Sequence, residues 1–366
     1  MENPLLETKV WQYLETHLGM DVSAFALLKS PFENLSSAQL AKQLKGLQVL
    51  KEKVPLWFES KKVLCPMGLN LEQCSSQATA LYKVGLIDEK YPKKNGIDLT
   101  CGLGVDAFFF SRIFEKFTLV EQNEELLTLV KENFTNLKVE NVDFVLSNAE
   151  NFLSNNPKSF DFIYLDPDRR NKANQKRILP EDLSPNLHLI VDVLLERSPL
   201  VMVKFSPMMD LFQLIDSFFC SEIHVVAVKN QVKELVLLFD KNKENKNPKI
   251  VAVNLESTHK TFEFSLKNEQ ELAISYHSVQ KYLYLPNAAI LKAGSFKSIT
   301  KEYEVFKIDT NSHLYTSIEL LEDFPGKGYE ILEKVENLKS IAKQSFQLVV
   351  RNYPLNIHKI KAKYKL

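Results

Sequence analysis

The sequence has few of the features that mark exported, membrane-spanning or metal-binding proteins. Its four cysteines are scattered, with no CxxC pair and no histidine at ligand spacing, so neither zinc sites nor disulfides are expected. No run reaches the roughly 18 apolar residues of a membrane helix, and no basic segment followed by an apolar run opens the chain. We therefore expect a cytoplasmic protein with reduced thiols, no metal and no membrane partner.

The sequence also lacks an excess of charge of either sign. It has 46 basic and 46 acidic residues, so a global basic field is excluded and any nucleic-acid contact must come from a local patch. Hydrophobic residues make up 45% of the chain, which is typical of a globular protein. The length of 366 residues exceeds the roughly 250–300 at which a single core stops growing. More than one domain is therefore predicted.

The apolar pattern divides the chain into three predicted domains. Residues 1–85 have apolar positions at helical spacing and are predicted to form a helical N-terminal cap. Residues 86–240 alternate short apolar runs with amphipathic segments, which predicts a parallel α/β sheet. A charged, Asn-rich stretch at 241–249 predicts a linker. Residues 250–366 mix strand-like and helical runs, which predicts a small α+β domain.

Seven apolar runs in the central domain are predicted strands. They are Gly96–Thr100, Phe117–Glu121, Val142–Leu146, Phe160–Asp166, Leu200–Phe205, Glu222–Val228 and Glu234–Phe239. Residues 229–233 are too few for a helical crossover, so the last two strands are predicted to form an antiparallel hairpin. In the C-terminal domain, residues 328–343 predict a helix and residues 346–353 a strand.

The strongest chemical signal follows the first predicted strand. Asp98, Gly102 and Gly104 form a DxxxGxG pattern where the strand should end and a helix should begin. Glycines there let the backbone turn sharply and approach a ligand, and a helix N-terminus offers unpaired N–H groups. The pattern is compatible with a nucleotide-like ligand and also with a tight strand-to-helix turn alone.

Polar residues also follow the second and third predicted strands. Glu121 closes the second strand, where a carboxylate either accepts hydrogen bonds from both hydroxyls of a ribose or is simply solvated. Asn148, Ala149 and Glu150 follow the third strand, where they either border an adenine or cap a helix. These positions share the carboxyl edge of the sheet, where ligands bind in open α/β folds.

The catalytic candidates close the fourth predicted strand. The run Asp166-Pro167-Asp168-Arg169-Arg170 is compatible with a type I turn. The two arginines beside it either hold a phosphate or pair with surface carboxylates. If the nucleophile of the reaction is an amine, the Asp166 side chain and the Pro167 carbonyl are suited to accept hydrogen bonds from it. We take Asp166, Pro167, Arg169 and Arg170 as the candidates.

Together these motifs and the terminal hairpin resemble the ordered motifs of class I S-adenosylmethionine-dependent methyltransferases, over about residues 70–240. Segments 71–83 and 349–366 and the DPxRR form of the fourth motif resemble, more narrowly, bacterial methyltransferases of undefined substrate with a ferredoxin-like insert and a THUMP-like C-terminal domain. The implied fold is a Rossmann-like sheet with an antiparallel terminal hairpin, a helical N-terminal cap and a small α+β C-terminal domain.

The resemblance implies S-adenosyl-L-methionine as the cofactor and assigns roles to the residues of the site. Asp98 and the two glycines shape the site of the methionine part, Glu121 holds the ribose, residues 148–150 border the adenine and Asp166 faces the substrate. It also implies that three residues before the first strand lie over the cofactor. They are Gln73, Ser75 and Ser76.

One departure leaves the methyl acceptor open. Amino-directed methyltransferases of this fold often have a second proline and then an aromatic residue after Asp-Pro, where this chain has Asp168 and Arg169. A base amino group is therefore one candidate acceptor beside other nucleophiles. The pattern does not indicate an oligomeric state.

The C-terminal tail suggests that the partner is RNA, either tRNA or rRNA. From Arg351 onward the chain has no acidic residue. The tail combines Arg351, Lys359, Lys361, Lys363 and Lys365 with Tyr353 and Tyr364. Such a strip can neutralise phosphates and stack on bases, although a basic tail is also commonly just solvated. The RNA prediction depends on the family resemblance.

Two other functions stay open on sequence. Gly102, Gly104 and Ala107 satisfy the Gly/Ala form of the dinucleotide fingerprint, which would make the chain an NAD-dependent oxidoreductase with Glu121 on the ribose. A non-catalytic RNA-binding protein that keeps a methyltransferase fold is the other alternative, because fold does not determine function.

Overall fold

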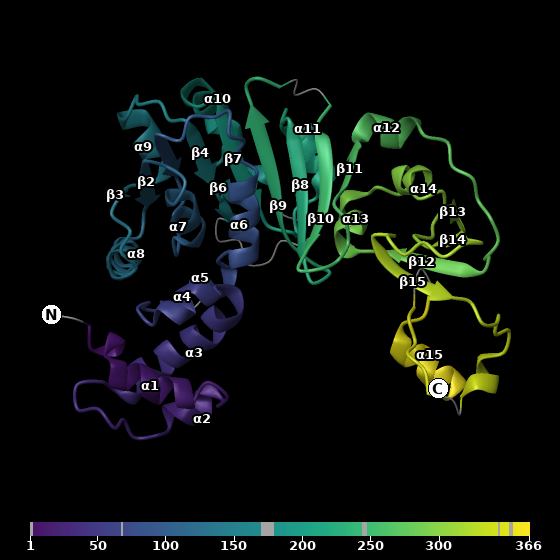
Figure 1. Cartoon of the computed structure of the whole chain (residues 1–366), viewed down its shortest axis with the longest axis horizontal. Coiled ribbons are helices and arrows are strands. Elements are labelled where there is room, and N and C mark those ends of the chain that lie inside the picture. Colours follow the sequence, from purple (N-terminus) through teal and green to yellow (C-terminus); the bar gives the residue numbers. More distant parts are fainter. Residues whose placement is uncertain (1–2, 67–68, 170–178, 244–246, 343–344, 351–353) are drawn as a thin grey trace. The chain divides into compact units, whose positions relative to one another are not determined.

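The fold is described from a computed structural model (Figure 1). The structure describes residues 3–66, 69–169, 179–243, 247–342, 345–350 and 354–366. The chain divides into two compact units. Unit 1 comprises Met1–Ile223 and Glu234–Lys246, and unit 2 comprises His224–Lys233 and Asn247–Leu366. The boundary therefore crosses the strand hairpin near residue 230.

Unit 1 begins with helices. They are the 3-10 helix η1 (Pro4–Leu6) and α1 (Thr8–Thr16), α2 (Val22–Ala26), α3 (Ser37–Lys53), α4 (Pro55–Ser60), α5 (Leu69–Gln73) and α6 (Gln77–Gly85). α3 begins at a capping box, in which the Ser36 hydroxyl accepts a hydrogen bond from the Gln39 amide and the Gln39 side chain accepts one from the Ser36 amide. Trp11 and Trp57 are almost fully buried in this region.

A short segment connects these helices to the sheet. The Gln43 side chain of α3 donates to the Val63 carbonyl at 2.7 Å and accepts from the Cys65 amide at 3.0 Å. Between them, both backbone groups of Leu64 bond to the Asn133 side chain at 2.8 and 2.9 Å. Buried polar side chains thus satisfy the backbone groups of this irregular segment.

The central feature is a nine-stranded sheet of order β11-β10-β8-β9-β7-β4-β1-β2-β3 (Figure 1). Its strands are β1 (Asn95–Asp98), β2 (Lys116–Glu121), β3 (Val142–Leu146), β4 (Phe162–Leu165), β7 (Leu200–Phe205), β8 (Glu222–Val228), β9 (Gln231–Asp240), β10 (Lys249–Leu255) and β11 (Phe262–Ser265). β3, β2, β1, β4 and β7 are parallel, and β9 pairs antiparallel with β7. The predicted mixed sheet with a reversed terminal hairpin is confirmed.

The hairpin turn has a local cause. Lys229 and Asn230 have φ angles of 49° and 64°. Two consecutive left-handed residues match the twist of a two-residue hairpin turn, in which asparagine is well tolerated. Beyond the hairpin, β10 and β11 continue the same sheet, and their residues belong to unit 2. A charged linker signals a loop but does not tell which sheet the next strand joins.

Helices and aromatic side chains complete unit 1. The helices are α7 (Val105–Ser111), α8 (Glu124–Asn136), α9 (Ala149–Asn155), α10 (Leu187–Arg197) and α11 (Leu211–Ser217), with the 3-10 helix η2 (Pro180–Asp182). Phe110 on α7 contacts Phe117 of β2 and Phe162 of β4, with ring centroids 6.0 and 5.0 Å apart. These rings anchor α7 to the strands that carry the candidate site.

Unit 2 contains a four-stranded antiparallel sheet of order β13-β14-β12-β15. Its strands are β12 (Tyr282–Pro286), β13 (Phe306–Lys307), β14 (Tyr315–Ser317) and β15 (Gly326–Glu330). The helices of this region are α12 (Leu266–Glu271), α13 (Ala288–Ala293), α14 (Ser298–Glu302), the 3-10 helix η3 (Leu338–Ile341) and α15 (Ile357–Tyr364). Among the described residues, no helix is both long and apolar enough to cross a membrane.

Two sequence predictions in this region were wrong. Residues 328–343 do not form one helix: the segment starts within β15, and of its described residues, up to 342, only Leu338–Ile341 is helical. Leu283 of β12 faces Tyr329 of β15, and a Cβ at Gly326 would lie 2.1 Å from the Leu285 carbonyl oxygen. Pairing with β12 therefore outweighs the helical periodicity of the segment. Residues 346–350 of the predicted strand 346–353 are not in a strand, and residues 351–353 lie outside the described residues.

This close approach predicts that Gly326→Ala destabilises unit 2 by about 3 kcal/mol, since backbone must move to admit the methyl group. Gly328→Ala is the matched change on the same strand. Its Cβ would meet a Tyr284 ring atom at 3.2 Å, so we expect a loss of less than about 1 kcal/mol. Urea unfolding followed by circular dichroism measures both.

Tryptophan fluorescence serves as the internal control for these variants. Trp11 and Trp57 are the only tryptophans of the chain and both lie in unit 1. A Gly326→Ala protein as stable as the Gly328→Ala protein would contradict the close packing of β15 on β12.

Candidate active site

The loop between β1 and α7 leaves its backbone open to a ligand. Gly102 and Gly104 have φ angles of 56° and 78°, a region that side chains disfavour. A Cβ at Gly102 would find only one atom within 4 Å, the Thr100 carbonyl oxygen at 3.8 Å. At Gly104 the same atom would lie 2.9 Å from the Phe134 ring. Gly102 thus provides open space and Gly104 allows close packing on α8.

Glu121 ties this loop to the end of β2. Its Oε2 accepts a hydrogen bond from the Gly102 amide at 2.9 Å, and its Oε1 accepts one from the Asn123 amide at 2.9 Å. Each carboxylate oxygen has a second lone-pair position. The side chain is half-buried, so Glu121 can position the loop and still accept hydrogen bonds from two ligand hydroxyls.

The end of β3 lies next to Glu121. The Ser147 amide donates to the Glu121 carbonyl at 3.0 Å. Asn148 caps α9, with its Oδ1 accepting from the Asn151 amide at 2.7 Å. Ala149 is buried and Glu150 is half-buried in the first turn. The capping interpretation of Asn148 is therefore observed, and contact of residues 148–150 with an adenine stays a prediction.

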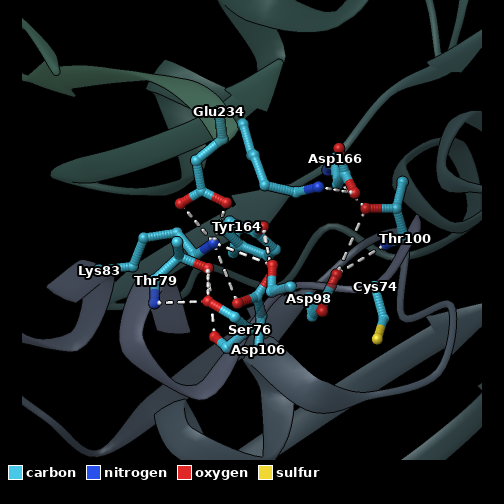
Figure 2. Close-up of polar contacts among 12 residues, drawn as sticks. Cys74, Ser76, Thr79, Lys83, Asp98, Thr100, Asp106, Tyr164, Asp166 and Glu234 are labelled. Atoms are coloured by element: carbon cyan, nitrogen blue, oxygen red, sulfur yellow. Dashed lines mark hydrogen bonds and ion pairs between the residues drawn. The ribbon is translucent and has the colours of Figure 1, made fainter. Parts of the chain in front are cut away.

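A chain of hydrogen bonds joins the ends of β1 and β4 (Figure 2). Asp98 Oδ1 accepts from the Thr100 amide at 2.9 Å and from the Thr100 hydroxyl at 3.4 Å. The same hydroxyl oxygen accepts from the Asp166 amide at 2.6 Å. Asp98 is only 1% exposed. Burial raises the pKa of its carboxyl well above the usual value, while the Thr100 amide lowers it.

The catalytic candidates are only partly described. The Asp166 side chain is 37% exposed and Pro167 is buried. Arg169 belongs to β5 (Asp168–Arg169), which pairs antiparallel with β6 (Leu183–Ser184). The structure does not describe the Arg169 side chain, and Arg170 lies outside the described residues.

Lys204, which sequence reasoning missed, pairs with Asp166. It lies on β7, and its Nζ is 2.5 Å from Asp166 Oδ2. Burial lowers the pKa of Lys204, but the carboxylates of Asp166, Glu234 and Asp106 outweigh it and leave the pKa above its usual range. Burial raises the pKa of Asp166, and Lys204 opposes that shift. A single lysine in an apolar run had no distinguishing sequence signal.

A buried charged cluster lies around Lys83 of α6 (Figure 2). Lys83 Nζ donates to both carboxylate oxygens of Glu234 at 2.8 and 2.9 Å and to the Ser75 hydroxyl at 3.0 Å. It also lies 3.1 Å from Asp106 Oδ1, without hydrogen-bond geometry. Asp106 Oδ2 accepts from the hydroxyls of Ser75 and Tyr164, each at 2.7 Å. Ser75 thus belongs to this cluster.

The charges of this cluster are nearly inaccessible to water. The side chains of Lys83, Asp106 and Glu234 are 0%, 10% and 5% exposed. Burial raises the pKa of Asp106, but Lys83, Lys204 and the two hydroxyls outweigh it and lower the pKa below its usual value. Burial raises the pKa of Glu234 despite Lys83. The cluster is therefore held together by charge pairing inside a low-dielectric region.

The other two residues expected over the cofactor have different positions. Gln73 is exposed at the end of α5. Ser76 caps α6, where its hydroxyl accepts from the Thr79 amide at 3.2 Å. Thr100 connects Asp98 to Asp166, and Gly102 separately bonds Glu121, all at the same sheet edge. Ser75 belongs to the buried cluster.

The sheet defines the class of this protein. An order of β3-β2-β1-β4-β7-β9-β8, with β9 reversed, is a Rossmann-like sheet in which the last strand inserts antiparallel beside β7. The acidic ends of β1, β2 and β4 lie at its carboxyl edge, which is the position of ligand sites in such folds. The chain has the class I methyltransferase fold.

Comparisons with known proteins agree with this assignment. The family described as conserved hypothetical protein 95 matches residues 80–202, and a ferredoxin-like domain family matches residues 282–325. A protein from Porphyromonas gingivalis W83, provisionally named a methyltransferase, is 27% identical, with 100% of this chain and 93% of that chain covered and a TM-score of 0.85. The chain is therefore similar to it over its whole length, including the ferredoxin-like region.

Other similarities are weaker. A SAM-dependent methyltransferase from Agrobacterium tumefaciens is 13% identical, with 44% of this chain and 60% of that chain covered and a TM-score of 0.34. An rRNA methylase from Streptococcus thermophilus is 12% identical over 48% of this chain and 99% of that chain, with a TM-score of 0.32. Neither score is high enough to bear on function. No curated protein matched the sequence significantly.

Burial of Asp98 predicts that Asp98→Asn stabilises unit 1 by more than about 1 kcal/mol at pH 7.5, because the variant removes a buried carboxylate. A carboxyl whose pKa is raised by folding contributes to the stability of the folded state at pH values below its pKa in the unfolded chain. It loses that contribution as the pH rises. The gain should therefore shrink as the pH falls toward about 4. Thermal unfolding followed by tryptophan fluorescence measures it.

Asp88→Asn is the control for this change, because the Asp88 side chain is 57% exposed and should show no gain. Lower stability of the Asp98→Asn protein at pH 7.5 would contradict the assigned cost of the buried carboxyl.

The buried cluster predicts that Lys83→Met destabilises unit 1 by about 3–5 kcal/mol, since Asp106 and Glu234 lose their shared cation. Lys90→Met is the matched control. Lys90 pairs with Asp240 at 3.4 Å but is 43% exposed, so we expect less than about 1 kcal/mol. Urea unfolding followed by tryptophan fluorescence compares them, and equal losses would refute the cluster's contribution.

Proposed function

We propose that the chain is an S-adenosylmethionine-dependent methyltransferase that acts on RNA. The observation that carries the proposal is the contact between Glu121 and Gly102. It places a carboxylate with free lone-pair positions beside an open stretch of backbone, at the ligand edge of a methyltransferase sheet.

The residues present fit the cofactor. Its ribose offers two hydroxyl donors, which suit Glu121. Its sulfonium and amino groups are cationic, and the site has an acidic edge made by Asp98, Glu121 and Asp166. Gly102 leaves room for close approach. Asp98, Gly102 and Gly104 would hold the methionine part and Asn148–Glu150 the adenine.

The cofactor supplies a methyl group already activated by the sulfonium, so placement of the acceptor is the main task of the protein. Asp166 is suited to that task because it lies at the end of β4 with a partly exposed carboxylate. It can accept hydrogen bonds from a neutral amine and aim the nitrogen lone pair. The Pro167 carbonyl would accept the second hydrogen, and Arg169 and Arg170 would bind a phosphate.

RNA is supported by the C-terminal helix. Lys359, Lys361 and Lys363 of α15 are exposed, and so is Lys365 after it. Lys363 Nζ lies 5.1 Å from the Tyr364 ring centroid. Exposed cations beside a half-buried aromatic ring suit phosphates and an unstacked base. Arg351 and Tyr353 lie outside the described residues.

The cofactor is tested by calorimetric titration with S-adenosylhomocysteine and, separately, NAD. We expect S-adenosylhomocysteine to bind and Glu121→Gln to weaken it by about ten- to a hundredfold, since hydrogen bonds to a charged group are each worth about 1.5–3 kcal/mol. Asp98→Ala should weaken it as well. Glu125→Gln, at an exposed position of α8, is the control.

Binding of NAD alone would replace the proposal with an oxidoreductase. Binding of S-adenosylhomocysteine without methyl transfer to any RNA fraction would favour a non-catalytic RNA-binding protein.

The RNA partner is tested with a triple variant, Lys359→Gln, Lys361→Gln and Lys363→Gln. Its affinity for single-stranded RNA should fall, and the slope of log affinity against log salt should decrease by about 2, because each phosphate contact on a single strand contributes about 0.7. The matched control changes Lys327, Lys334 and Lys339, which are exposed elsewhere in unit 2. Equal slopes for both triples would contradict a role for α15.

A further inference from the structure

Lys204 and Asp166 occupy equivalent positions on neighbouring strands. β4 and β7 are parallel, and Leu165 pairs with Val203 in their register. The residues that follow this pair are Asp166, directly after the end of β4, and Lys204 within β7. Equivalent positions of parallel neighbours point to the same face of a sheet, which explains the 2.5 Å separation of Nζ and Oδ2.

The Asp166 carboxylate is held at one of its two oxygens. Its Oδ2 contacts Lys204, and its backbone amide is held by the Thr100 hydroxyl at 2.6 Å. Within the part of the chain that the structure describes, no hydrogen bond to Oδ1 is found. The side chain of Asp166 is 37% exposed and that of Lys204 12%. The pair is therefore more accessible than the cluster around Lys83.

Charged groups from several elements face this pair. Lys204 faces Asp166, Glu234 of β9 and Asp106 of α7. Asp166 faces Lys204, and further charges come from Asp106 and Lys83 of α6. Asp98 of β1 is a further carboxyl close enough to interact with Asp166. Carboxylates outnumber ammonium groups, so Lys204 stays a cation and is unsuited to be a base. Its shortest contact is with Asp166.

We propose that Lys204 is a positioning residue for methyl transfer, an inference that rests on the proposed function. Its ammonium binds Oδ2 of Asp166, so that Oδ1 stays ionised and turned toward the amine that accepts the methyl group. Without Lys204, the partly exposed Asp166 carboxyl would take up a proton at higher pH and present a hydroxyl at one of its oxygens.

The titration of Asp166 tests this without any substrate. The protein is labelled with ¹³C at aspartate side-chain carboxyls, Asp166→Asn assigns the signal, and the pH is varied. Lys204→Met should move the midpoint of Asp166 upward by roughly 1–3 pH units, which is the usual effect of losing a close opposite charge. Lys204→Arg should restore a midpoint near that of the native protein, and Lys90→Met should leave it unchanged.

An unchanged midpoint in Lys204→Met overturns the proposal. If that variant fails to fold, as judged by tryptophan fluorescence, Lys204→Gln is titrated in its place with the same expectation. A purely structural role for Lys204 would lower stability without moving the midpoint of Asp166 in the folded protein.

Methyl transfer provides the second measurement. The probe is unfractionated RNA from a strain that lacks the gene for this chain, with radiolabelled S-adenosylmethionine. Lys204→Met should lower kcat by at least about tenfold, keep KM for the cofactor within about twofold, and move the acid limb of the pH profile upward with the Asp166 midpoint. Lys204→Arg should recover most of the rate.

The two proposals fail in distinguishable ways. If the native protein binds no S-adenosylhomocysteine, the proposed function fails whatever Asp166 does. If the native protein methylates RNA and Lys204→Met does so with the same pH profile, only the role of Lys204 fails.

Discussion

The arrangement of unit 1 depends on the burial of one ammonium group among carboxylates. Lys83 of α6 pairs with Asp106 of α7 and Glu234 of β9, and an unpaired charge at this depth would cost several kcal/mol. The three elements therefore have to meet. Their meeting places the first turn of α7 and the Ser75 hydroxyl. Because α7 begins at Gly104, the same pairing sets the position of the glycine loop.

The candidate site is held by hydrogen bonds but also contains a carboxyl that lowers the stability of the fold. Glu121 holds the Gly102 amide, and Thr100 connects Asp98 to the end of β4. Asp98 is nevertheless a buried carboxyl in an acidic neighbourhood, which a protein selected for stability alone would replace. Buried charges kept at the ligand edge of a sheet are typical of functional sites. An acidic edge of this kind matches a ligand that brings positive charge, which supports the cofactor proposed from the contact between Glu121 and Gly102.

Fold and function rest on different observations here. Similarity over the whole chain, together with the reversed strand β9, establishes the class I methyltransferase fold and its ferredoxin-like region. Such a fold can host many activities. The proposed methyl transfer instead depends on the polar groups at the carboxyl edge, and the RNA partner depends on exposed lysines of α15. Both proposals, methyl transfer and RNA binding, therefore rest on particular side chains, which the fold alone does not determine.

The sequence by itself determined the local elements. Alternation of apolar runs located all strands from β1 to β9 that form the central sheet, and Asp98, Glu121 and Asp166 at the strand ends indicated the edge of the proposed site. These features have short-range causes, namely periodicity and turn chemistry. Only the tertiary structure decided that Lys83 meets Glu234, 151 residues away, and that the apparent helix at 328–343 begins as β15. Charge pairing and strand pairing across such distances leave no pattern in the local sequence, because the conformation of each segment depends on a second segment far away in the chain.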